Sequence, residues 1–141
     1  MTMPQTYTTV RAGTFPQRCA ARLGLIAAML LLRLLPFQLT VRLVRLARRF
    51  GRRPLAPERA EDLVSAVRYA GRRWPVRIAC MESSLAAVLA AAITGRKLNW
   101  CFGVRFVPPP VEYHAWAEAP GHGPVGEDTD ADWPYHTALS L

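Results

Sequence analysis

The first third of the chain carries two helical patterns, one apolar almost throughout and one sharply two-sided. Residues 18–35 are predominantly apolar and are followed by Pro36, which disrupts a helix interior, so this pattern predicts a helix over 18–35. Over 37–50, leucines and arginines recur separately at helical spacing, which predicts an amphipathic helix with a basic side. The apolar positions are Leu39, Leu43, Leu46 and Phe50, and the arginines are Arg42, Arg45, Arg49 and Arg52.

Two further helices are expected beyond the linker at 51–57, which is rich in helix breakers. Pro57 suits the first turn of a helix, and the acidic residues that follow it suit the positive end of the helix dipole. Gly71 favours a helix end, so this helix is predicted to run from Pro57 to Gly71. The stretch 80–94 is rich in helix formers and is followed by Gly95, which predicts a fourth helix there.

Beyond Gly95 the spacing of apolar residues changes from helical to alternating, which is typical of β-strands. Residues 98–106 and 111–119 are predicted as two strands, and 124–127 as a short third one. We expect the remainder, 128–141, to be irregular. Helices followed by an antiparallel meander predict an α+β fold, in which N-terminal helices precede a catalytic helix and a small antiparallel sheet.

At 141 residues, about half of them apolar, the chain is long enough to form a single hydrophobic core. We expect a flexible tail over 1–17, a basic amphipathic helical region over 18–56 and the core domain over 57–141. The net charge of +8 is uneven, because residues 1–77 carry +12 and residues 78–141 carry −4.

The basic side of the helical region is either a solvated helix face or a docking surface. The docking targets that it would suit are an acidic surface of a partner protein, an acidic leader peptide and anionic lipid, and docking to a partner ranks ahead of contact with a membrane surface. Nucleic acid is not expected, because the sequence contains no recognised binding motif for it.

The apolar run in the first predicted helix is not expected to be a membrane span or a signal peptide. Ten apolar residues from Leu23 to Leu32 are followed by Arg33 and then by Pro36. A spanning helix needs roughly 20 apolar residues, and a signal peptide needs a small-residue cleavage site where Arg33 stands. Peripheral contact with a membrane remains compatible with this pattern.

The three cysteines, Cys19, Cys80 and Cys101, match neither a disulfide framework nor a zinc site in number and spacing. We therefore expect a cytoplasmic location and no metal. Cys101 lies in an apolar predicted strand and is interpreted as structural, and Cys19 as incidental. Cys80 differs because it stands at a predicted helix start, where unpaired N–H groups and the helix dipole lower the pKa of a thiol.

A thiolate nucleophile needs a histidine within reach, and the histidine needs an acceptor that orients it. His114 lies in the middle of a predicted strand, and Glu127 or Asp128 is expected on the next strand, where either carboxylate could lie beside the imidazole. Taken singly, Cys80 would be a packed thiol and His114 a solvated side chain. Taken together, these residues form a candidate catalytic triad, with the backbone N–H of Cys80 as an oxyanion donor.

The sequence around this triad resembles a known family. "CMESSLAAVLAAAITGRKLNWCFGVRF" followed by "EYHAWAEAPGHGPVGE" is similar to the transglutaminase-like cysteine proteases of lasso-peptide biosynthesis, the stand-alone leader-peptidase halves of the split B maturation protein. The N-terminal "LLLRLLPF" with its trailing arginines is also typical of that family. The matching pieces are Cys80, Ser84-Leu85-Ala86, Gly103-Val104, His114-Ala115-Trp116 and Pro124 to Glu127.

The resemblance implies a transglutaminase/papain-like core in a bacterial cysteine peptidase that removes the leader from a ribosomally made precursor peptide. It implies Cys80 as the nucleophile, His114 as the general base and Glu127 as the third member, with Asp128 as the alternative. The implied partners are the precursor, a small leader-recognition protein and an asparagine-synthetase-like cyclase; no cofactor is implied. Two rivals stay open: acyl transfer to an amine, as in a true transglutaminase, and a non-enzymatic membrane or partner adaptor.

Overall fold

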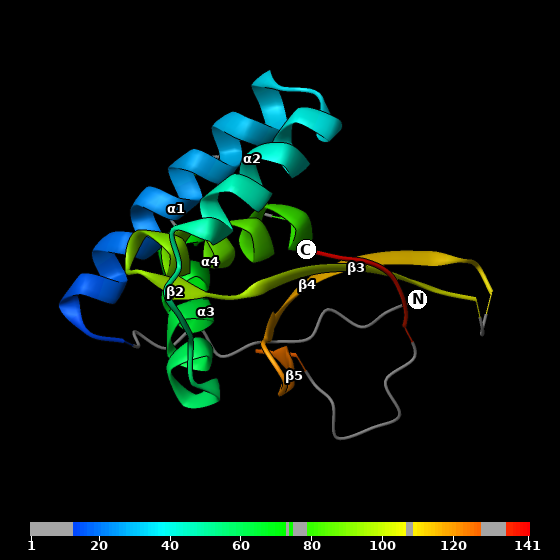
Figure 1. The fold of residues 1–141 in the computed structure, drawn as a ribbon. Helices are drawn as coiled ribbons and strands as arrows, with labels where there is room; N and C mark the ends of the chain where they lie inside the picture. The colour runs from blue at the N-terminus through cyan, green and yellow to red at the C-terminus, as the bar shows by residue number, and fades with distance from the viewer. Residues whose placement is uncertain (1–12, 73, 75–78, 107–108, 128–134) are drawn as a thin grey trace.

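The computed structural model describes residues 13–72, 74, 79–106, 109–127 and 135–141. Within them the helices gather on one side and a sheet extends from them on the other (Figure 1), which confirms the α+β prediction. The helices are α1 (Phe15–Leu34), α2 (Phe37–Arg49), α3 (Pro57–Gly71) and α4 (Cys80–Ile93). The strands are β1 (Arg53–Pro54), β2 (Arg96–Lys97), β3 (Asn99–Arg105), β4 (Glu112–Ala119), β5 (Gly123–Val125) and β6 (His136–Ser140).

The first helix begins earlier than the sequence pattern predicts. Thr14 caps it, because the Thr14 hydroxyl accepts the Gln17 N–H at 3.4 Å while the Gln17 side chain accepts the Thr14 N–H at 3.2 Å. Residues 15–17, which the sequence analysis assigned to the flexible tail, therefore form the first turn of α1. The predicted tail over 1–12 lies outside the described residues.

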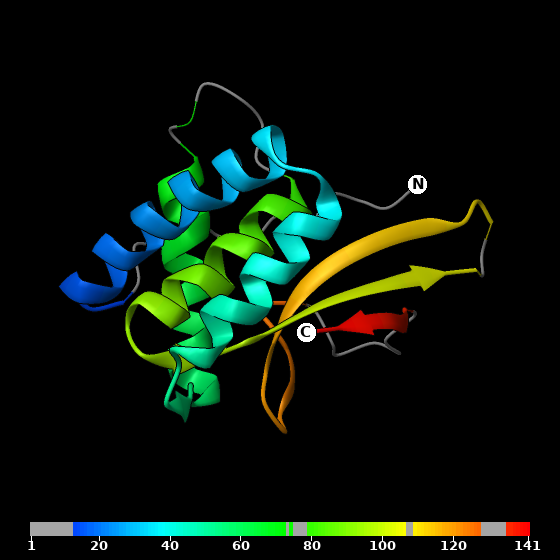
Figure 2. The same ribbon diagram turned by 45° about the horizontal axis from the view of Figure 1, so that its top comes forward.

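The main sheet has four strands in the order β5-β4-β3-β6, and every neighbouring pair is antiparallel. β6 corrects the sequence analysis, which expected 128–141 to be irregular. This segment is short and mostly exposed, so its strand conformation depends on pairing with β3 rather than on its own pattern (Figure 2). A separate parallel pair, β1 with β2, was also not predicted, since each of its strands has only two residues.

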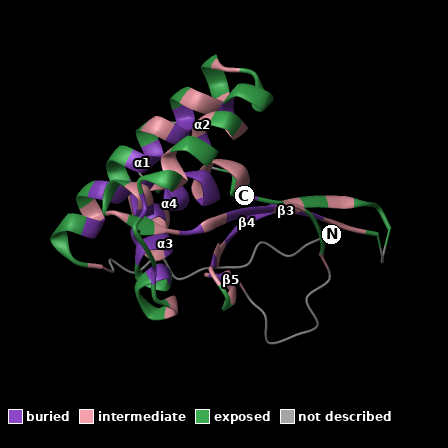
Figure 3. Ribbon diagram, in the orientation of Figure 1, coloured by how far each residue is buried: buried purple, intermediate pink, exposed green. Residues whose placement is uncertain are grey.

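Helix α4 is the centre of the fold. It is apolar all round and is buried from Ser84 to Ala91, as expected for a helix covered on several sides. Helices α1 and α3 pack against it, and β4 covers another side, so the buried residues concentrate around α4 (Figure 3). Contact with α1 is close: a Cβ atom at Gly24 would lie 2.5 Å from the carbonyl oxygen of Ala86. This packing fixes the start of α4 relative to the sheet.

Candidate active site

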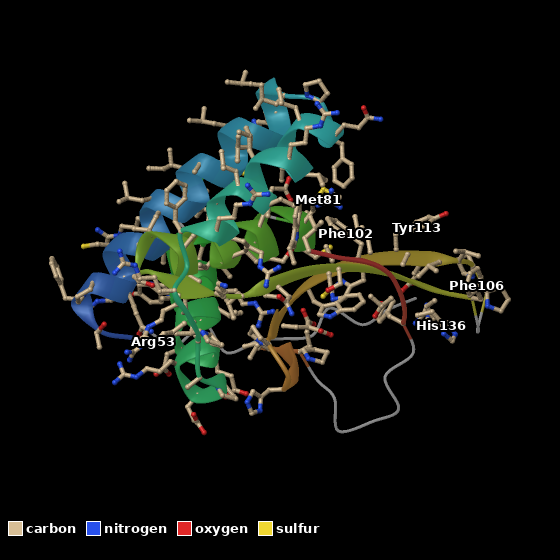
Figure 4. The ribbon with its side chains drawn as sticks, in the orientation of Figure 1. Arg53, Met81, Phe102, Phe106, Tyr113 and His136 are labelled. Carbon is tan, nitrogen blue, oxygen red and sulfur yellow. The ribbon has the colours of Figure 1, made fainter. Side chains whose placement is uncertain are left out.

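Cys80 is the first residue of α4, so the predicted position of this thiol at a helix start is confirmed. The turn is closed by the Ala79 N–H, which donates to the Glu82 carboxylate at 3.1 Å. Cys80 is exposed, while the rest of α4 runs into the core. Met81, the next residue, marks this first turn in Figure 4, where α4 approaches β3. A thiol at this position is open to a substrate and lies at the positive end of the helix dipole.

His114 of β4 meets Cys80 at the start of α4. A hydrogen bond with the His114 side chain lowers the pKa of Cys80, and the backbone of Ala115 also lowers it, against partial burial, which raises it. Burial lowers the pKa of His114, but hydrogen bonds with Cys80 and Glu127 raise it to about 9. Because the pKa of Cys80 falls while the pKa of His114 rises, the pair is shifted toward a thiolate beside an imidazolium.

Glu127 lies in the bend after β5, two residues beyond Val125 and therefore outside the strand predicted over 124–127, and its carboxylate is 3.3 Å from Nε2 of His114. Its side chain is only 8% exposed, so its interaction with the imidazole is weakly screened by water. The structure thus brings Cys80, His114 and Glu127 together. Asp128, the alternative third member, lies outside the described residues.

Arg68 of α3 holds this carboxylate in position and was not singled out by the sequence analysis. Its guanidinium donates to the carbonyl oxygen of Gly126 at 2.6 Å and lies 3.7 Å from the Glu127 carboxylate. Gly126 has a φ of +70°, and a Cβ there would lie 2.7 Å from the Val64 side chain. The absence of a side chain at Gly126 therefore allows this turn to pack closely against α3. This packing places the Glu127 carboxylate beside His114. An arginine in an amphipathic helix carries no sequence signal for such a role.

Replacing Glu127 with glutamine is expected to lower kcat/KM by about 10²-fold or more, because the imidazolium loses the charge that stabilises it. The alkaline limit of activity should also move to lower pH, since Glu127 raises the pKa of His114. A pH profile of the thiol-dependent activity checks both effects. Glu61→Gln, at an exposed position of α3, is the matched control. Loss of activity in Asp128→Asn but not in Glu127→Gln would assign the orienting role to Asp128.

Aromatic rings form one wall of the site. The imidazole of His114 stacks on the buried indole of Trp116, with ring centroids 5.9 Å apart and planes at 22°, and the Tyr135 ring lies 5.0 Å away. The indole N–H of Trp116 donates to the Glu118 carboxylate at 3.0 Å. Gly103 leaves room for this indole, because a Cβ there would lie 2.5 Å from the ring. These contacts restrict the orientation of the imidazole.

Ser84 links the start of α4 to the sheet. The indole N–H of the buried Trp100 donates to the Ser84 hydroxyl at 3.0 Å, and this hydroxyl donates to the Cys80 carbonyl oxygen at 2.6 Å. The bridge joins β3 to the residue that carries the thiol. The sequence offered Ser84 only as part of the family motif, with no indication of this role.

Replacing Ser84 with alanine is expected to lower the free energy of unfolding by about 1–3 kcal/mol, because the buried Trp100 N–H loses its acceptor. Urea denaturation of the two proteins measures this difference. Ser83→Ala is the control, since the Ser83 hydroxyl makes only an exposed 3.3 Å bond to the same carbonyl. Equal stability of the Ser84 and Ser83 variants would contradict a structural role for the bridge.

The other cysteines differ from Cys80 in their surroundings. Cys101 is fully buried and its thiol lies 3.3 Å from the Ser140 hydroxyl; burial raises the pKa of Cys101 to about 11. This location confirms its interpretation as a structural residue. Cys19 is exposed on α1. Among the described residues, no three His, Cys, Asp or Glu side chains are grouped so that they could hold a metal ion.

Comparison with known proteins adds a family to this geometry. No curated protein and no solved structure matches the chain. A family model described as the transglutaminase-like superfamily matches residues 23–140, which include α2 to α4, the main sheet and all three residues of the candidate triad. The chain belongs to the transglutaminase-like superfamily, which includes cysteine peptidases and acyltransferases.

Proposed function

We propose that this protein is a cysteine peptidase that removes the leader peptide from a lasso-peptide precursor. The observation that carries the proposal is the hydrogen-bonded group of Cys80, His114 and Glu127 at the exposed start of α4. Such a group supplies a nucleophile, a proton carrier and an orienting charge, which are the parts that thiol-dependent acyl transfer needs. The sequence resemblance to lasso-peptide leader peptidases supports the choice of substrate.

In the first step, the Cys80 thiolate attacks the scissile carbonyl carbon and forms a tetrahedral oxyanion. The Cys80 N–H, at the first position of α4, is a candidate donor to this oxyanion. The His114 imidazolium then protonates the leaving amine, which departs as the free N-terminus of the core peptide. The leader remains bound as a thioester. In the second step, neutral His114 takes a proton from water while the water oxygen attacks the thioester carbonyl carbon. The C–S bond then breaks, which returns Cys80 to a thiolate beside the His114 imidazolium, and the leader leaves as a carboxylic acid that loses its proton to solvent.

A transglutaminase-type acyltransferase is the second candidate, because membership of the superfamily fits it equally well. The two activities share the thioester and differ only in whether water or an amine attacks it. The proposed peptidase would act with the precursor, a small leader-recognition protein and an asparagine-synthetase-like cyclase in the bacterial cytoplasm. A non-enzymatic adaptor is the third candidate, and it would need none of the three triad residues.

Mass spectrometry of the products separates these candidates. The full chain is incubated with a lasso precursor, with and without the recognition protein, and with an added primary amine. We expect two fragments whose masses add up to the precursor plus one water, and faster cleavage when the recognition protein is present. A product that carries the amine would favour the acyltransferase. No change in the precursor under any condition, with folded protein, would reject the peptidase.

A further inference from the structure

Helix α1 presents an apolar stripe to solvent. Seven of its residues are buried against the rest of the fold, among them Leu25 and Met29, yet a second row of large apolar side chains faces outward. The exposed fractions are 56% for Leu23, 46% for Ile26, 54% for Leu30 and 73% for Leu34, with 70% for Phe15 at the start of the helix. These positions recur at helical spacing and form one line along a 20-residue helix. A folded domain rarely leaves such a continuous row uncovered.

Helix α2 also presents a row of apolar side chains to solvent. Its buried residues are Thr40 and Val44, and the Thr40 hydroxyl donates to the Leu31 carbonyl oxygen of α1 at 3.2 Å. The apolar side of the predicted amphipathic helix therefore points away from the core: Leu39, Leu46 and Phe50 are 40%, 49% and 70% exposed. Both helices pack on α4 through their other faces. The exposed apolar rows of α1 and α2 therefore have no packing partner among the described residues.

The charges beside these rows have one sign. Residues 13–53 contain nine arginines and no acidic residue. Arg22 and Arg33 of α1, and Arg42, Arg45 and Arg49 of α2, are all exposed. Leucine and arginine side by side on a helix, with Phe at the ends, is the composition of helices that lie in a membrane interface. The surface includes no tryptophan or tyrosine, two of the residue types enriched in protein–protein hot spots; of the three enriched types it carries only arginine.

We infer that the outer rows of α1 and α2 form a docking surface for an anionic lipid bilayer. The leucines enter the boundary between headgroups and acyl chains, and the arginines contact the phosphates while their aliphatic stems stay in the apolar layer. α1 is long and apolar enough to cross a membrane by length and composition, but its inner side is part of the core. It would therefore lie in the plane of the interface. α1 is on the side of α4 away from the main sheet, so docking leaves β4 facing the other way (Figures 1 and 2).

Flotation with vesicles of phosphatidylcholine alone, or of phosphatidylcholine with phosphatidylglycerol, tests this inference on the full chain. Wild type is expected to float with the anionic vesicles and to be released by salt. The triple variant Leu23→Gln, Leu30→Gln, Leu34→Gln should bind these vesicles with an affinity at least about tenfold lower than that of the wild type. Its matched control replaces three exposed apolar residues elsewhere, Ile93, Val111 and Phe106, with glutamine. Circular dichroism and thermal melting check that each variant is folded.

A second pair of variants tests the charges. Arg22→Gln with Arg33→Gln should weaken binding to anionic vesicles, whereas Arg59→Gln with Arg96→Gln, of equal net charge, should not. No flotation of the wild type, or equal effects of matched variants, would overturn the inference. A dimer that the leucine variant converts to monomer, without flotation, would assign the surface to a second copy. Arginine-dependent retention on polyglutamate without flotation would assign it to an acidic protein.

Discussion

Cys80→Ala is expected to abolish turnover of the precursor, with kcat reduced by about 10⁴-fold or more. Alanine at this position removes the only atom that can form the thioester, while the helix start keeps its backbone geometry. Since Cys80 is exposed and its side chain contributes little packing, the variant should remain folded. Single-turnover cleavage assays followed by mass spectrometry measure the loss, and the acyl-enzyme mass should disappear with it.

Cys19→Ala is the control for this substitution, because Cys19 is also a free and exposed thiol. It should keep wild-type activity. Full function of the Cys80 variant would exclude covalent catalysis by this residue and leave the non-enzymatic adaptor as the better account.

His114→Gln is expected to lower kcat by about 10³-fold or more, because both the thiolate and the proton for the leaving amine depend on the imidazole. In the wild type, activity should rise with pH as Cys80 ionises and fall as His114 loses its proton, at a pKa of about 9. The rising and falling limbs of this pH–activity profile follow from the directions of two pKa shifts: the pKa of Cys80 is lowered and the pKa of His114 is raised. The variant should lose the alkaline limb and retain a much lower rate.

His122→Gln serves as the control for His114, since His122 is exposed in the turn between β4 and β5. Its pH profile should match the wild type. An alkaline limb that persists unchanged in His114→Gln would show that another group supplies the proton.

Local sequence patterns predicted α3 and α4 well because both helices have clear boundary signals, whereas the start of α1 was predicted three residues too late. Pro57 and Gly71 bound α3, and α4 runs from Cys80 to Ile93, one residue short of the predicted end. β6 was missed because its strand conformation comes from pairing with β3, which no local pattern encodes. The sequence also did not reveal that the apolar side of α2 faces solvent. Periodicity shows that a helix has two different sides, but not which of them packs against the core.

The same distinction applies to the site. The residues of the candidate triad, Cys80, His114 and Glu127, were proposed from sequence because chemistry and a family motif select them, and the structure places the three side chains together. Arg68 and Trp100 could not, because their contributions arise from contacts between segments far apart in the chain. Arg68 resembles any helix arginine, and Trp100 resembles any core aromatic residue. Only the packing of α3 and β3 around α4 turns them into supports of the triad.

The rate of alkylation of Cys80 as a function of pH, followed by peptide mass spectrometry, measures whether its sulfur is held ionised by the imidazole. In wild-type protein Cys80 should react near neutral pH ahead of Cys19 and Cys101, and the midpoint should move to higher pH in His114→Gln. A Cys80 reactivity profile that is the same in both proteins would show that the sulfur and the imidazole do not act as a pair.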